Sequence, residues 1–156
     1  MWASHVLGPS ALKRTALIAA GVLVFLAISG LLARYLSAEN AERDKDLALL
    51  QAQARGDAAG MVALLSGCRE SPACVATQTS NARTLRRAGA VKILSLKSAS
   101  AYTLTGATGT TRLAWAVIGR LPVVQCVGVR RTGNPITGIN VTLLSLSAPI
   151  PNEANC

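Results

Sequence analysis

The chain has 156 residues, a formal net charge of +9 and only 3% aromatic residues. This length can build one small hydrophobic core, which excludes an arrangement of several large domains. The basic charge favours anionic partners, but the few aromatic side chains argue against nucleic acid, whose single strands bind by stacking on aromatic rings.

The first element is an apolar segment without a charged residue, from Thr15 to Ala33. As a helix it would extend roughly 28 Å, close to the thickness of a bilayer's hydrocarbon core. We therefore predict a transmembrane anchor at residues 15–36, with residues 1–14 as a cytoplasmic tail. A cleaved secretory signal is the alternative, with a weak cleavage site at Ala27–Ser29, although the apolar region of a signal is usually shorter, about 7–15 residues.

The residues after the anchor have the composition of a helix, rich in Ala, Leu, Glu, Lys and Gln. We expect a juxtamembrane helix at residues 37–56, into which the anchor can continue. Gly56 predicts its end, because glycine adopts the left-handed conformation that terminates helices. Asp57 is then placed to cap a second helix that reaches about residue 68, with apolar residues at helical spacing. The extracytoplasmic domain is expected to cover residues 57–156.

A third helix is expected to begin at Ser71 or Pro72 and to run to about Ala88. After Gly89 the apolar residues recur at every second position, which is typical of strands. Four strands are expected, at residues 91–98, 111–118, 123–130 and 139–147. In the first of them, the alternation places Leu94 and Leu96 on the same face.

The expected strands are separated by the short, turn-rich links GATG, GRLP and TGNP. Such links favour antiparallel pairing between strands that follow one another in the chain. The predicted fold class is therefore α+β. It consists of an N-terminal transmembrane helix followed by helices packed on a four-stranded antiparallel meander.

Four cysteines follow the anchor: Cys68, Cys74, Cys126 and Cys156. They allow three pairings, of which we favour Cys68 with Cys74 and Cys126 with Cys156. Disulfides form in oxidising compartments, so this part of the chain is expected outside the cytoplasm. Zinc is the competing chemistry, but no Cys-x-x-Cys spacing occurs and the single histidine, His5, precedes the anchor. No metal or cofactor is expected.

The segment ALLQAQARGDAAGMVALL, residues 48–65, resembles the opening of cystatin-like and nuclear-transport-factor-two-like domains. Those domains place an Ala-rich helix, a Gly-Asp break and a second helix before a curved antiparallel sheet, which wraps the helices into a half-open cone. The segment LPVVQCVGVRRTGNPITG, residues 121–138, is similar to a stretch of uncharacterised membrane proteins of high-GC bacteria. The resemblance implies a cone-like domain over roughly residues 38–148, held by a single-pass anchor.

Enzymes that resemble this cone fold place Asp, Glu, His or Tyr inside the cone. Here residues 71–156 contain one carboxylate, Glu153, one tyrosine, Tyr102, and no histidine. General acid–base catalysis needs a titratable pair within reach of the substrate, and the sequence offers no such pair. We therefore expect a protein that is not an enzyme.

The region after Ser71 is strongly basic, with nine Lys and Arg residues against the single acid Glu153. We expect one cluster to share a face of the third helix and another to lie beside a turn; these are Arg83, Arg86 and Arg87, and Arg130 and Arg131. Both clusters are candidate contacts for anionic lipid headgroups, an acidic polymer or an acidic protein. The alternative is a solvated basic surface that keeps the protein soluble.

These features predict an accessory or scaffold subunit of an envelope complex, anchored in the cytoplasmic membrane with its C-terminal domain outside the cytoplasm. Scaffold proteins of type IV secretion and the membrane proteins associated with mammalian-cell-entry lipid transporters look similar, with one anchor and such a domain. One alternative is a small apolar ligand in the cone, lined by Met61, Leu94, Trp115 and Val127. A pilin-like subunit is the weakest alternative, because the apolar segment lacks an acidic residue.

Overall fold

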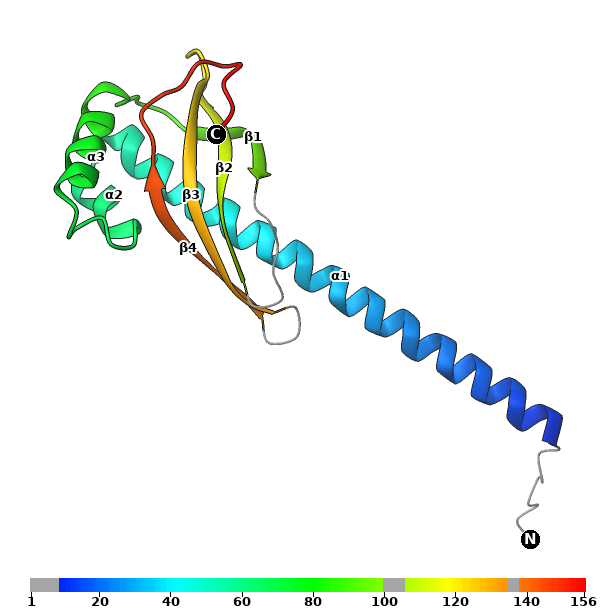
Figure 1. Ribbon diagram of the computed structural model, residues 1–156. Coiled ribbons are helices and arrows are strands. Elements are labelled where there is room, and N and C mark those ends of the chain that lie inside the picture. The colour runs from blue at the N-terminus through cyan, green and yellow to red at the C-terminus, as the bar shows by residue number, and fades with distance from the viewer. Residues whose placement is uncertain (1–8, 100–105, 135–137) are drawn as a thin grey trace, which may run out of the picture.

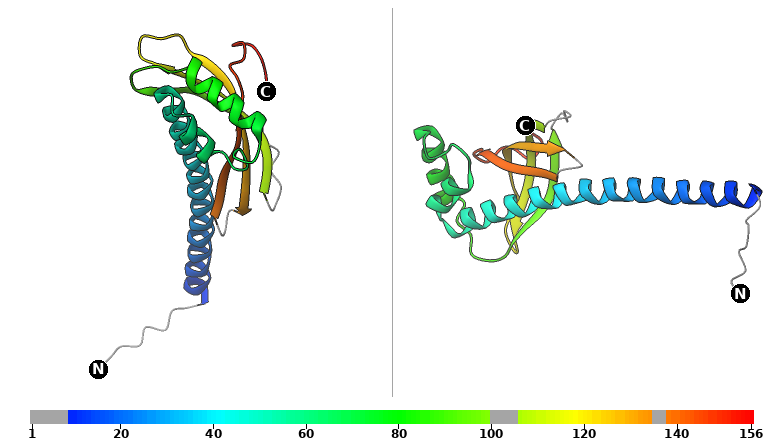
Figure 2. Two further views of the ribbon diagram at one scale, coloured as in Figure 1. Left: turned by 90° about the vertical axis from the view of Figure 1, so that its left-hand side faces the viewer. Right: turned by 90° about the horizontal axis from the view of Figure 1, so that it is seen from below.

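The computed structural model describes residues 9–99, 106–134 and 138–156. These residues form three helices followed by four strands, so the expected α+β class is confirmed. One long helix, α1, extends far beyond the folded domain, and its second half packs on one face of the sheet (Figures 1 and 2). The two shorter helices lie near the end of α1 that belongs to the domain.

Helix α1 runs without a break over Pro9–Arg55, a length of 47 residues. The predicted anchor and the predicted juxtamembrane helix are therefore one continuous helix. Its segment Lys13–Ala33 is long and apolar enough to cross a membrane, and none of it is buried against the domain. A core helix of a soluble protein would be mostly buried, so this segment does not belong to the core.

The end of α1 is built as the sequence predicts, at Gly56. Gly56 has φ of 79°, its N–H donates to the carbonyl of Gln53 at 2.9 Å, and the N–H of Asp57 donates to the carbonyl of Ala52 at 2.9 Å. This pair of bonds is the Schellman arrangement that satisfies the last carbonyls of a helix. The Asp57 side chain then accepts from the N–H of Gly60 and caps α2, Ala58–Leu64.

Helix α3 spans Pro72–Thr84 and begins with Ser71 as its cap, as expected. Its end comes earlier than the predicted Ala88. The chain leaves the helix because the backbone N–H of Arg87 donates to the carbonyl of Ala54 at 2.9 Å, which ties this segment to the last turn of α1.

The strands are β1 Val91–Ala99, β2 Gly106–Val117, β3 Val123–Asn134 and β4 Gly138–Leu146. They lie in the sheet in the order β1-β2-β3-β4, and each pair of neighbours is antiparallel. The expected break at GATG is wrong. Gly106 is already the first residue of β2, and it pairs with Thr132 of β3. A Cβ at Gly106 would lie 2.4 Å from the carbonyl oxygen of Arg131, so only glycine lets the strand begin there. The expected TGNP break also begins too early, because β3 continues to Asn134, while residues 135–137 lie outside the described part.

One prediction for β1 is wrong. The register between β1 and β2 shifts between Ile93 and Ser95, which marks a β-bulge. A bulge adds one residue to one strand and reverses the side on which the following residues fall. As a result Ile93 and Leu96 pack against the core, while Leu94 is 58% exposed.

The free edge of β4 is covered by the helices. Three carbonyls on this edge accept hydrogen bonds. The Lys45 side chain donates to Val141, the backbone N–H of Ser66 donates to Leu143, and the Gln78 side chain donates to Leu146. Strand edges that keep unpaired carbonyls invite pairing with other chains. The helices therefore close this side of the sheet, and β1 forms the other edge.

Candidate functional site

Both expected disulfides are present in the structure. Cys68 is joined to Cys74 and Cys126 to Cys156, with Cα atoms 5.3 and 5.8 Å apart. These separations are normal for disulfides. Because all four cysteines are paired, and no group of three or more His, Cys, Asp or Glu side chains comes together among the described residues, the described part contains no candidate metal centre.

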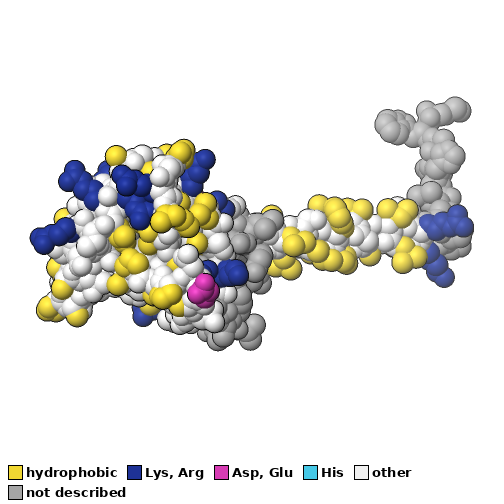
Figure 3. Space-filling view, turned by 90° about the horizontal axis from the view of Figure 1, so that it is seen from above, with side chains coloured by type: hydrophobic (Ala, Val, Ile, Leu, Met, Phe, Trp, Pro, Cys, Tyr) yellow, Lys and Arg dark blue, Asp and Glu magenta, His cyan; other side chains and the backbone are white. Residues whose placement is uncertain are grey.

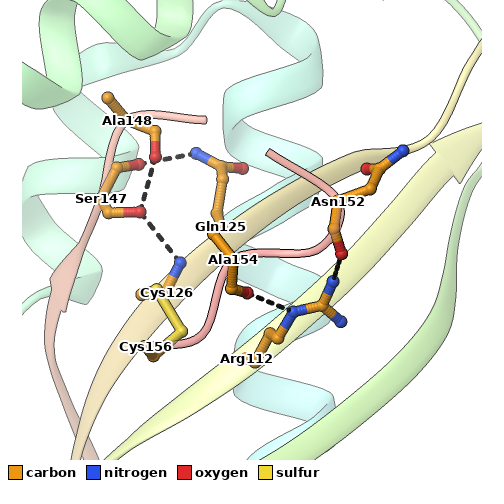
Figure 4. Close-up of a disulfide and its surroundings, with 8 residues drawn as sticks. All are labelled: Arg112, Gln125, Cys126, Ser147, Ala148, Asn152, Ala154 and Cys156. Atoms are coloured by element: carbon orange, nitrogen blue, oxygen red, sulfur yellow. Dashed lines mark hydrogen bonds between the residues drawn. A yellow bond between two sulfur atoms is a disulfide. The ribbon is translucent and has the colours of Figure 1, made fainter. Parts of the chain in front are cut away.

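The Cys126–Cys156 disulfide holds the tail that follows β4 against the outer face of the sheet (Figure 4). Arg112 on β2 donates to the carbonyls of Asn152 and Ala154, the latter at 3.0 Å. The N–H of Cys126 donates to the hydroxyl of Ser147 at 2.9 Å. Arg112 thus stabilises the fold, because its guanidinium is hydrogen-bonded to the tail.

Arg131 is not the exposed contact that the sequence predicts. It is only 7% exposed, and its guanidinium donates twice to the Glu42 carboxylate of α1, from Nε at 2.8 Å and from Nη2. The same guanidinium donates to Ser98 at 2.6 Å, and the hydroxyl of Thr111 donates to the other Glu42 oxygen at 2.7 Å. Arg131 on β3 alternates with its exposed neighbour Arg130, so the two never shared one surface.

Asp46 lies one turn beyond Glu42 on the same buried face of α1. It is fully buried, and neither of its carboxylate oxygens has a hydrogen-bond partner among the described residues. The pKa of Asp46 is raised from 3.8 to about 7; burial is the largest cause, the nearby Glu42 carboxylate acts in the same direction, and Arg131 opposes both. A neutral carboxylic acid avoids the cost of burying a second negative charge.

A second polar link joins α1 to the sheet deeper in the core. Gln53 and Gln125 exchange hydrogen bonds of 3.0 and 3.2 Å, and the indole N–H of Trp115 donates to Gln125 at 2.8 Å. Gln125 also donates to the carbonyl of Ser147 at 2.8 Å. All three large side chains are fully buried, so this link is part of the core.

The three arginines predicted to share a face of α3 are separated. Arg83 is exposed in the last turn of α3, but Arg86 and Arg87 follow the helix because it ends at Thr84. Arg87 is half-buried: its guanidinium lies 5.5 Å from the centre of the Trp115 ring and donates to the carbonyl of Leu121 at 2.7 Å. Arg87 therefore fixes the fold locally, while Arg83 and Arg86 remain open to a partner.

Arg86 and Arg87 instead join Arg55 at a pocket of about 460 Å³, between the end of α1 and the segment that leads into β1. We call it the distal arginine pocket; its lining also includes Gln51, Ala54, and residues 88–91. None of these lining residues is acidic. Gly56 helps to shape it, since a Cβ there would lie 3.2 Å from the Cδ of Arg86.

The side chains of this pocket have the chemistry that suits an anion. Guanidinium groups present fixed forks of N–H donors that match carboxylate and phosphate oxygens. Arg55 lies in the last turn of α1, where a cation is also favoured by the partial negative charge of the helix end. The lining holds no carboxylate, histidine or thiol that could act as a base or nucleophile.

The residues expected to line an apolar cavity do not surround one cavity. Met61, Trp115 and Val127 are fully buried in the core cluster, whereas Leu94 points outward from the β1 bulge. Two further hollows, of about 510 and 260 Å³, lie beside α3 and beside β1. Neither is lined by any of these four residues.

The buried polar side chains of α1 are not among the site residues that the sequence predicts. Glu42, Asp46 and Gln53 share a buried face of α1 with Leu49 and Leu50. Their spacing was the available signal, because residues three, four and seven apart lie on the same side of a helix.

No protein-family model, no curated protein and no solved structure matches this chain. The functional assignment therefore depends on the geometry described above.

Proposed function

We propose that the protein is a non-catalytic, single-pass membrane protein, and that its extracytoplasmic domain serves as an accessory or scaffold subunit of an envelope complex. In this proposal Lys13–Ala33 spans the cytoplasmic membrane and the disulfide-bonded domain lies outside the cytoplasm. The exposed apolar segment and the two disulfides support this topology.

The observation that carries the proposal is the continuity of α1. The residues from Ala33 to Arg55 would rise about 33 Å above the membrane if α1 stood upright. The same helix supplies core residues to the domain, including Leu49 and Leu50. A flexible tether would let a domain sample a wide volume, whereas a shared helix holds it at one height and in one orientation. A fixed position suits a subunit that must meet neighbours in a complex.

The chemistry of the domain also favours docking over catalysis. Its buried carboxylates, Glu42 and Asp46, lie between α1 and the sheet, where they stabilise or perturb the packing instead of facing a pocket. The distal arginine pocket offers cations without a base. We propose the cone-like, cystatin-like fold by analogy alone, on the order of helices before an antiparallel sheet.

A second candidate function is binding of an anionic polymer through the basic surface. Figure 3 shows dark blue Lys and Arg side chains spread over the visible face of the domain, with very little acidic surface. Such a field attracts any polyanion. Binding of this kind needs only charge. Its affinity should therefore fall steeply with salt concentration and depend little on the shape of the polymer.

The test compares two insertions of equal length in α1, placed after Ala38, between the apolar segment and the first buried residue. Seven alanines keep the helix and raise the domain by about 10 Å, whereas seven Gly and Ser residues turn the segment into a flexible tether. Crosslinking in intact cells, followed by purification of the full chain, should recover partner proteins with the native chain. Both insertions should reduce this recovery, because both disturb a fixed geometry.

Recovery of the native chain only as a monomer would refute the scaffold function. Undiminished recovery with the Gly and Ser insertion would show that the rigid helix is not needed, which removes the observation on which the proposal depends.

A further inference from the structure

The turn between β2 and β3 exposes two large apolar side chains at the end of the domain. Ile118 is 73% and Leu121 83% exposed, more than any other large apolar residue of the described domain. The N–H of Arg120 donates to the carbonyl of Val117 at 3.0 Å, and Gly119 has φ of 79°, which defines a tight turn with glycine at its third position. We call residues 118–122 the tip.

The residues of the tip are unusual for a turn. Turns favour Gly, Pro, Asn, Asp and Ser, because these residues adopt turn geometry or satisfy the backbone. Gly119 and Pro122 fulfil that role here, but Ile118, Arg120 and Leu121 do not. A β-branched Ile at the apex of a turn contributes little to the isolated domain, since Ile118 is 73% exposed. Arginine beside exposed apolar residues is typical of protein–protein interfaces.

The tip and the distal arginine pocket form one continuous surface. Arg87 lines the pocket and donates to the carbonyl of Leu121 in the tip at 2.7 Å. Its backbone N–H is bonded to Ala54 in α1, and its guanidinium lies over Trp115. The tip is thereby held in a fixed position beside the exposed arginines Arg55 and Arg86.

This surface lies at the end of the domain that is farthest from the apolar half of α1 (Figures 1 and 2). Arg55, the last residue of α1, belongs to it, so the surface is about 33 Å beyond Ala33 along the helix. With α1 upright, headgroups of the membrane in which the protein is anchored are out of reach at that distance. The occupant must come from the compartment or from a neighbouring protein of the complex.

We propose that the tip and the distal arginine pocket together dock a segment of a partner protein that carries carboxylates beside apolar side chains. The carboxylates match the guanidinium groups of Arg55, Arg86 and Arg120, and the apolar side chains cover Ile118 and Leu121. An anionic polysaccharide or polyphosphate would satisfy the arginines but would leave the apolar residues in water. This inference rests on the proposed docking function and names its surface and the chemistry of its partner.

The experiment uses the full chain in living cells. The photo-crosslinking residue p-benzoylphenylalanine replaces Ile118 or Leu121, and in a matched control it replaces Leu94, which is also an exposed apolar residue but lies on β1. Adducts are then measured in the native background, in the double charge reversal R55E and R86E, and in K92E, a charge reversal at an exposed lysine on β1. Oxidation of all four cysteines reports that each variant is folded.

A protease-sensitive adduct should form from positions 118 and 121 but not from 94. R55E with R86E should reduce it about tenfold or more, because the reversed charges repel the carboxylates, while K92E should leave it unchanged. Three outcomes overturn the inference: no adduct at the tip, an adduct that survives protease, or an adduct that R55E with R86E does not reduce. The crosslinking experiment on the native chain described under the proposed function separates the two ideas. If it still recovers partner proteins in any of these cases, the docking function stands and only this surface is wrong.

Discussion

Replacing Asp46 by Asn should stabilise the protein at neutral pH and remove most of its pH dependence. Asp46 is fully buried beside Glu42 and Arg131, and neither of its oxygens is hydrogen-bonded among the described residues. In the folded protein its pKa is raised to about 7, against 3.8 for the ordinary side chain. The folded state therefore binds this proton more tightly than the unfolded state does, which links stability to pH.

The sign and the size of the effect follow from that difference. The stabilising contribution of the protonated carboxyl is fully present below about pH 4 and is lost as the pH rises through 7. A rise from 3.8 to about 7 corresponds to a loss of up to about 4 kcal/mol in the free energy of unfolding. Asn keeps the size of the side chain and carries no charge at any pH, so D46N should avoid this loss.

The assay is denaturant unfolding of the full chain in nanodiscs between pH 4 and pH 8, followed by the fluorescence of Trp115 in a Trp2→Phe background. The matched control is D44N, because Asp44 is an exposed acid on the same helix. D46N should exceed the native protein in stability at pH 8 by up to about 4 kcal/mol and approach it at pH 4, whereas D44N should differ by less than about 0.5 kcal/mol. If D46N and the native chain lose stability in parallel between these pH values, Asp46 is charged in the folded state and the reasoning is wrong.

Three further predictions test the packing around the site. R131M should lower the free energy of unfolding by about 3–5 kcal/mol, because it leaves the Glu42 carboxylate buried without its cationic partner. In the same denaturation experiment the control R130M should change it by less than about 0.5 kcal/mol. Equal effects of the two substitutions would contradict the buried pair. C156S should cost about 3–4 kcal/mol by removing the longer disulfide loop, and should speed hydrogen exchange in the tail over β3, so an unchanged tail would mean that Arg112 alone holds it. G106A should loosen the start of β2, since its Cβ would lie 2.4 Å from the carbonyl oxygen of Arg131, and amide exchange as slow as in the native β2 would refute the close approach.

The elements that the sequence predicts well are those whose signals are local. Gly56 and Asp57 end one helix and cap the next through their own backbone and side chain, so these boundaries can be read from residue type. The apolar segment before Ala33 is equally local, and so is the choice of Cys68 with Cys74 across a short loop. Strand alternation located all four strands for the same reason.

The failures arise where a distant segment decides the outcome. The third helix stops early because Ala54, far away in the sequence, captures the N–H of Arg87. Leu94 faces outward because the pairing with β2 contains a bulge, and a bulge has no signature in the residues of one strand. Arg131 looked like half of a surface pair, but its partner Glu42 comes from α1 and was visible only once helix and sheet were packed together.

The buried polar links explain how a helix that enters the domain from the proposed membrane span can set the direction of the tip. Apolar packing is non-directional, so Leu49 and Leu50 alone would allow α1 to slide or rotate on the sheet. Glu42 with Arg131 and Gln53 with Gln125 fix the helix at two points about three turns apart. A rotation of α1 would leave these groups buried without partners, which is far more costly than lost apolar contact. The buried polar links therefore give the apolar half of α1 and the tip of the domain one fixed relative orientation.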